Sequence, residues 1–189
     1  IRLRANGTFD TSFGAGGTVT IALRDLGHGA VPALVVMPDA RVVVALGGYL
    51  PLTGANTVMR RRADGSLDTS FDSDGIAQSA PASVPIDVVD MVAQPDGKVT
   101  VLAHDYVPTT LLFMYRLGAN GRVDGTFGDA ASRTNLLASG ITTGRSIDLI
   151  RRPDGRYAAM TAGTTGPAST IMLARTDANG KNGSTVALS

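Results

Sequence analysis

The sequence predicts an all-β protein built from repeated units, and three observations support this fold class. One phrase recurs along the chain with a nearly fixed period, and its leading arginines are 58, 56 and 59 residues apart. Apolar side chains recur with a period of two, which is the period of strands, and the 23 glycines mark many turns. A fixed period of this size indicates a repeat architecture in which each unit covers the next. The copies span residues 2–13, 60–71 and 116–127, with a worn copy at 175–183.

The first complete unit contains four candidate strands in order. Threonine and apolar side chains alternate over residues 17–23, which is a strand pattern. A short apolar run follows at 33–37, then a turn at 38–40, where proline fixes φ and the aspartate bonds the backbone ahead of it. The third strand is the β-branched run 42–46. The fourth is the polar segment 57–62, which ends at an Asp-Gly turn signal.

The next two copies repeat this pattern. Each has two apolar strands around a Pro-Asp-Gly turn, where the first copy has Ala40 in place of the glycine. The predicted strand pairs are 88–94 with 99–103, and 147–152 with 157–161.

Four short strands per copy of about 58 residues is the content of one β-propeller blade. A coil of a β-helix would be shorter, and helical repeats would need amphipathic helices that the sequence does not contain. The predicted blades are residues 17–63, 75–118 and 132–176, with flanking strands at 1–4 and 184–188.

Three blades are too few for a closed ring, because propellers use typically four to eight. We therefore expect another copy of the chain, a different chain or a further part of the gene product to complete the ring. A two-fold dimer would give six or seven blades, with the leading and trailing strands paired across the join. Unpaired edge strands would otherwise invite aggregation.

Two segments, Asp-Gly-Ser-Leu-Asp-Thr-Ser-Phe at 64–71 and Gln-Pro-Asp-Gly-Lys at 94–98, resemble the bacterial delta-sixty repeat. The resemblance covers nearly the whole chain and implies propeller blades in a secreted or surface-attached bacterial protein. It implies no catalytic residues. The chain departs from the pattern at Asp72, where the family has glycine, and at Gly125, which replaces the threonine of Asp-Thr-Ser-Phe. The last copy has neither the aspartate nor the phenylalanine, which is typical of a capping position.

An arginine and an aspartate recur eight residues apart in every intact copy. Across an Asn-Gly or Asp-Gly turn the two side chains can meet as a bidentate pair, and the phenylalanine that follows can act as a wedge between blades. A catalytic function needs one site, whereas this set occurs in each unit, so we interpret it as structural. Its members are Arg2, Arg60, Arg116 and Arg175, then Asp10, Asp68 and Asp124, then Phe13, Phe71 and Phe127.

Asp72 and Asp74 form the first of two candidate metal sites. Their carboxylates are spaced as in calcium loops, but no glutamate completes an EF-hand, and Asx turns explain aspartate before glycine without any metal. Calcium is therefore the alternative interpretation, and no other cofactor is indicated.

The two histidines, His28 and His104, form the second candidate site. Both are expected in connections on one face of adjacent blades, where they would bind a metal or act as acid and base. Zinc would need a third ligand, for which Asp25 and Asp105 are candidates. The simpler interpretation is that both are polar loop residues.

Composition limits the classes of function. A net charge of +1 gives no global basic field for nucleic acid or an anionic membrane. The absence of cysteine excludes disulfides and thiolate chemistry, and no stretch reaches the roughly 20 apolar residues of a membrane span. The chain starts inside a repeat at Ile1, without Met or a signal peptide, so we expect a mature product or a piece of something longer.

The sequence therefore favours a non-catalytic scaffold or binding module of an extracellular or cell-surface bacterial protein, with a protein or glycan as ligand. One alternative is an enzyme, a hydrolase or lyase, with a site on one propeller face near His28 and His104. Another is a processed segment or subunit of a larger complex.

Overall fold

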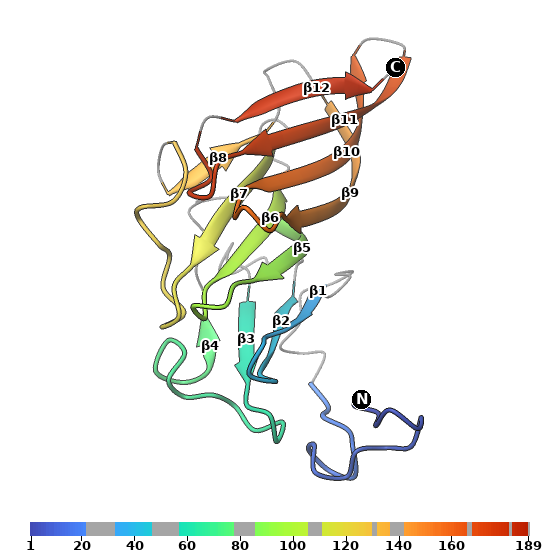
Figure 1. The fold of residues 1–189 in the computed structure, drawn as a ribbon, viewed down its shortest axis with the longest axis vertical. Helices are drawn as coiled ribbons and strands as arrows, with labels where there is room; N and C mark the ends of the chain where they lie inside the picture. Colours follow the sequence, from blue (N-terminus) through green and yellow to red (C-terminus); the bar gives the residue numbers. More distant parts are fainter. Residues whose placement is uncertain are drawn as a thin grey trace.

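The computed structural model describes residues 1–21, 33–46, 57–77, 86–105, 111–129, 132–136, 142–165, 168–181 and 183–188. It is all-β and consists of three four-stranded antiparallel sheets of similar size that resemble propeller blades (Figure 1). The prediction of an all-β fold of repeated four-stranded units is confirmed. The described part of the chain contains no helix that would cross a membrane.

Within each sheet the strands follow the order of the chain. The first sheet contains β1 (Ala33–Val36), β2 (Val42–Leu46), β3 (Thr57–Arg61) and β4 (Ile76–Ala77). The second contains β5 (Ile86–Ala93), β6 (Val99–Asp105), β7 (Leu111–Leu117) and β8 (Arg133–Asn135). The third contains β9 (Thr142–Arg151), β10 (Tyr157–Thr165), β11 (Ala168–Thr176) and β12 (Ser184–Leu188).

The predicted blade ranges 17–63, 75–118 and 132–176 each contain the first three strands of a sheet but not its fourth strand. The short strand after each arginine-bearing strand turns back onto it, so Met59 of β3 pairs with Ile76 of β4. The predicted flanking strand 184–188 is β12, which pairs with β11 as the fourth strand of the third sheet. Alternation along a segment identifies a strand, but the loop before it decides which neighbour it pairs with.

Successive side chains of a strand point to opposite faces of its sheet. A face is buried where another sheet lies beside it. The core between the first and second sheets includes Val43, Ala45, Val58, Val99, Val101 and Phe113. The core between the second and third sheets includes Leu102, Met114, Leu149, Tyr157, Ala159 and Met172. The middle sheet is thus apolar on both faces, as a blade between two neighbours must be.

The first strands of the three sheets are adjacent, β1 contacting β5 and β5 contacting β9. Figure 1 shows these three strands following one another along one side of the molecule, while β4 and β12 lie toward opposite ends. The sheets therefore fan out from their first strands.

Residues 1–21 form part of a further unit on the outer face of the first sheet. They contain the isolated bridges Leu3 to Phe9 and Ala15 to Thr18. Phe13 is buried in a third apolar cluster with Val42, Val44 and Met59, and Val19 packs against this cluster. This segment repeats the arginine-bearing strand and loop of the later copies.

Candidate functional site

The recurring arginine, aspartate and phenylalanine meet at one place in each unit because two consecutive Asx turns reverse the chain. In the second copy Asp64 Oδ1 accepts hydrogen bonds from the N–H and hydroxyl of Ser66, at 2.9 and 2.7 Å. Asp68 Oδ1 accepts the corresponding pair from Ser70, at 3.2 and 2.6 Å. The reversal brings Asp68 back beside Arg60, as the spacing of eight residues predicted.

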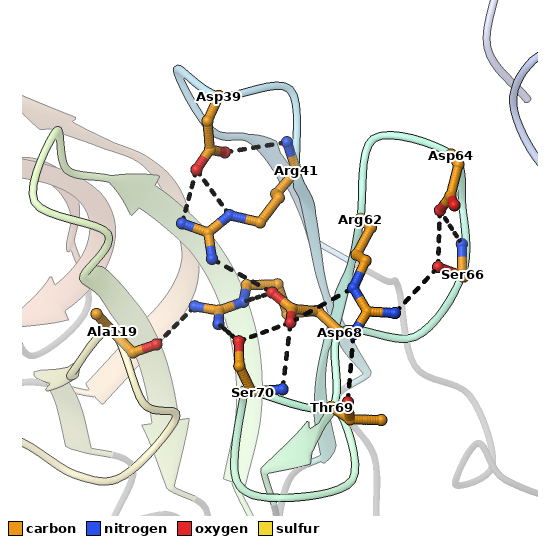
Figure 2. Close-up of polar contacts among 10 residues, drawn as sticks. Asp39, Arg41, Arg62, Asp64, Ser66, Asp68, Thr69, Ser70 and Ala119 are labelled. Atoms are coloured by element: carbon orange, nitrogen blue, oxygen red, sulfur yellow. Dashed lines mark hydrogen bonds and ion pairs between the residues drawn. The ribbon is translucent and has the colours of Figure 1, made fainter.

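Arg60 is the centre of this site, and Figure 2 labels three of its partners, Asp68, Ser70 and Ala119. Its Nε lies 2.8 Å from Asp68 Oδ2, and its Nη2 donates to Ser70 Oγ at 3.0 Å. The guanidinium carbon lies 4.5 Å from the centroid of the Phe71 ring, within cation–π range. The side chains of Arg60 and Asp68 are only 1% and 6% exposed. We call Arg60, Asp68, Ser70, Phe71 and their equivalents the clasp.

The clasp also forms hydrogen bonds with the next unit of the chain. Arg60 Nη1 donates to the carbonyl of Ala119 at 2.7 Å, and the N–H of Asp72 donates to the carbonyl of Asn120 at 2.8 Å. The glycine that follows, Gly121, has φ +84°, and a Cβ there would lie only 3.0 Å from a carbon of the Phe71 ring. We call the turn that receives a clasp, here residues 118–122, an acceptor turn.

The first clasp has the same geometry. Arg2 Nε lies 2.9 Å from Asp10 Oδ2, and the guanidinium lies 4.7 Å from the centroid of Phe13. Arg2 Nη1 donates to the carbonyl of Ala63, and the N–H of Gly14 donates to the carbonyl of Asp64 at 2.7 Å.

The third clasp also repeats it, with threonine in place of serine. Arg116 Nη2 lies 2.9 Å from Asp124 Oδ2, and the guanidinium lies 4.7 Å from the centroid of Phe127. Arg116 Nη1 donates to the carbonyl of Ala178 at 3.3 Å, and the N–H of Gly128 donates to the carbonyl of Asn179 at 2.9 Å. Three clasps of the same kind thus link four successive units, which are residues 1–21 and the three sheets.

The middle clasp is more strongly charged than the others. Burial acts to raise the pKa of Asp68, but the hydrogen bonds from Ser70, the charge of Arg60 and the hydrogen bond from Arg41 outweigh it and lower this pKa to about 2. Arg41 Nη1 lies 3.2 Å from Asp68 Oδ2. Burial also lowers the pKa of Arg60, which is nevertheless held charged by the adjacent carboxylate.

The fourth copy has no clasp. Arg175 pairs directly with Ser184 of β12, whereas the N–H of Arg60 bonds to Gly75 after a longer loop. Gly183 and Val186 stand eight and eleven residues after Arg175, where the intact copies have aspartate and phenylalanine. Arg175 is exposed and lines a depression of about 360 Å³ together with Arg152 and Arg156.

The candidate calcium residues, Asp72 and Asp74, take part in turn and surface contacts. Asp72 Oδ1 lies 3.8 Å from Nε of Arg122, and Asp74 Oδ1 accepts the N–H of Ile76 at 2.8 Å. Within the described ranges no group of three or more histidine, aspartate or glutamate side chains is placed to hold a metal ion. Calcium binding here stays a prediction.

His104 lies inside β6 and not in the connection where the sequence analysis placed it. Its backbone pairs with Asp87 on one side and Leu112 on the other, so the strand continues through it to Asp105. Its side chain is buried. His28 and Asp25 lie outside the described residues, so the proposed histidine pair stays untested.

Sequence reasoning missed two polar links between the second and third sheets. Asp90 Oδ2 accepts the N–H of Leu149 at 2.8 Å, and burial raises the pKa of this aspartate. The hydroxyl of Tyr157 accepts hydrogen bonds from Gln94 Nε2 and Thr100 Oγ1, both at 2.9 Å. Gln94 stands before a Pro-Asp turn, but the other two copies have Met37 and Arg152 at this position, so the repeat gave no signal for a polar link here.

No family model and no curated protein matches this chain.

Proposed function

We propose that this chain supplies successive blades of a β-propeller and acts as a non-catalytic scaffold or binding module. The observation that carries the proposal is the use made of the recurring residues. In each intact copy the arginine donates to the next unit, while the aspartate and the phenylalanine of its own copy hold the guanidinium in place. The repeated motif therefore serves assembly, and the surfaces of the loops and strands are left for binding.

The wider setting of the proposal comes from the resemblance to the delta-sixty repeat. The resemblance supports a secreted or cell-surface bacterial protein with a protein or glycan as ligand. This chain would then be one part of a larger assembly.

Ring completion is supported by the two end sheets, which expose apolar side chains on their outer faces. Leu34 and Val36 of β1 are 61% and 60% exposed, and Ile150, Ile171 and Val186 of the third sheet are also exposed. Such faces are the ones that a neighbouring blade covers. We propose that another copy or another chain completes the ring.

Two experiments test the proposal. Light scattering combined with cryo-electron microscopy of the chain together with the partner that completes its ring is expected to show an assembly in which at least four sheets surround one axis; sheets stacked along a line would contradict it. Arrays of glycans and extracellular proteins should identify a ligand that remains chemically unchanged after binding. Turnover of that ligand, abolished by His104→Ala in a variant that still folds, would establish an enzyme instead.

A further inference from the structure

The turn at residues 4–8 has the geometry of an acceptor turn. The N–H of Arg4 donates to the carbonyl of Thr8 at 2.8 Å, and the N–H of Gly7 donates to the carbonyl of Arg4 at 2.9 Å. The acceptor turn at 62–66 has the same two bonds, at 2.8 and 2.9 Å. Gly7 has φ +82°, close to the +87° of Gly65. The turn is therefore already shaped to receive a clasp.

The three equivalent turns are each occupied by the clasp of the preceding unit. The alanine carbonyl accepts the guanidinium, the next carbonyl accepts a backbone N–H, and the glycine lies against the preceding loop. The alanines are Ala63, Ala119 and Ala178, the next carbonyls belong to Asp64, Asn120 and Asn179, and the glycines are Gly65, Gly121 and Gly180.

The corresponding positions at the first turn are open. Ala5, Asn6 and Gly7 are exposed, and a Cβ at Gly7 would meet no atom within 4 Å. At Gly180, in contrast, a Cβ would lie 2.3 Å from the Phe127 ring. One acceptor turn of the four is thus formed but empty among the described residues.

An uncovered apolar surface lies on the same end of the molecule. The exposed side chains of Leu34 and Val36 line a cavity of about 300 Å³ with Phe13, Val42 and Val44. On the second sheet the face that meets the first sheet, which includes Val99 and Val101, is fully buried. The outer face of the first sheet is therefore only partly covered by residues 1–21.

We infer that the acceptor turn 4–8 and this apolar face bind a further repeat of the same type, one that carries an intact clasp and precedes residue 1 in the order of the ring. This inference rests on the proposed propeller. A second copy of this chain does not fit, because its three clasps are engaged within it and its fourth copy lacks the aspartate and phenylalanine. The partner offers a guanidinium, a backbone N–H and an aromatic ring.

The test adds such a repeat to the full chain. A copy of residues 111–173 is placed directly before Ile1. Ile1 then stands where Ala174 follows residue 173 in the original chain, and Arg2 stands where Arg175 does, so the spacing of the repeat is kept. Gly7→Ala is introduced into both the extended and the original chain. Gly16→Ala is the matched control, because Gly16 has φ +64° and a Cβ there also meets no atom within 4 Å.

We expect Gly7→Ala to lower Tm by at least about 4 °C more in the extended chain than in the original chain, because the added phenylalanine clashes with the new Cβ. Gly16→Ala should lower Tm equally in both. In the unsubstituted extended chain, hydrogen exchange should protect the added clasp as strongly as residues 116–128. Equal effects of Gly7→Ala in the two chains, or an unprotected added clasp, would overturn the inference.

The remaining outcomes separate this inference from the proposed function. Self-association of the original chain that Gly7→Ala abolishes would show that a second copy is the occupant, and would overturn the partner named above. If Gly121→Ala in the original chain costs no more than Gly16→Ala, the clasp does not join the sheets and the proposed function itself fails.

Discussion

Asp68 and Asp10 hold equivalent places in two clasps but differ in burial. The side chains of Arg60 and Asp68 are 1% and 6% exposed, whereas those of Arg2 and Asp10 are 28% and 22% exposed. Removing one partner of a buried pair leaves an uncompensated charge, so Asp68→Asn should lower the free energy of unfolding by about 3 kcal/mol. The equivalent change Asp10→Asn should cost clearly less, because solvent screens this more accessible pair. Urea denaturation of both variants measures the difference, and equal costs would contradict this account of the middle clasp.

The lowered pKa of Asp68 also predicts acid sensitivity. Its folded-state value of about 2 lies below the ordinary 3.8, so the ionised carboxylate stabilises the fold above about pH 4. This contribution, about 2 kcal/mol by linkage, is lost as the pH falls from about 4 to about 2. Denaturation midpoints measured over this range should decline less steeply in Asp68→Asn than in the unsubstituted protein. An identical decline would show that other groups dominate.

Ala40 is a residue in a position suited to glycine. It has φ 64° in the turn between β1 and β2, where the equivalent turns have Gly97 at 84° and Gly155 at 86°. A Cβ in the left-handed region costs roughly 1–2 kcal/mol, part of which is offset by the greater unfolded-state entropy of glycine. Ala40→Gly should therefore raise the free energy of unfolding by up to about 1 kcal/mol. Chemical denaturation would detect this gain, and a loss of stability would show that the Cβ makes a useful contact.

At the scale of elements, the phenylalanine of one unit packs against the acceptor turn of the next unit. A Cβ at Gly121 would lie 2.8 Å from the N–H nitrogen of Asp72 and 3.0 Å from the Phe71 ring. Gly121→Ala should therefore cost about 2–3 kcal/mol, combining positive-φ strain with overpacking. Gly16→Ala, which carries the strain alone, should cost about 1 kcal/mol. Thermal unfolding of the two variants separates these contributions.

The strands and the clasp were predictable from the sequence because their signals repeat. The spacing of eight predicted the contact between Arg60 and Asp68, and the Pro-Asp turns predicted the hairpin of β5 and β6. The partner of β4 was not predictable, because alternation does not reveal strand pairing.

Contacts between separate segments of the chain were not predictable. Arg41 of one Pro-Asp turn reaches Asp68, and Lys98 of the next such turn reaches Asp124. His104 continues a strand that was expected to end before it. These features depend on how separate segments pack, which spacing within one segment does not encode.

At the scale of the whole molecule, two kinds of contact join neighbouring sheets: the clasps, and the contacts between the first strands of the sheets. Each clasp lies in the arginine-bearing part of its unit, and the first strands β1, β5 and β9 contact one another in succession. In a propeller, sheets that are joined in succession turn about a common axis. The exposed apolar faces at the two ends are consistent with more blades on both sides.

The radial arrangement is tested most directly by distances between paired spin labels, which the absence of cysteine in the sequence makes simple to place. One labelled pair joins first strands, at Val36 and Ile150, and the other joins the outer parts of the same sheets, at Ser73 and Val186; all four positions are exposed. Double electron–electron resonance should give a clearly longer distance for the outer pair than for the inner pair. Equal distances would mean sheets stacked side by side, and would contradict a propeller.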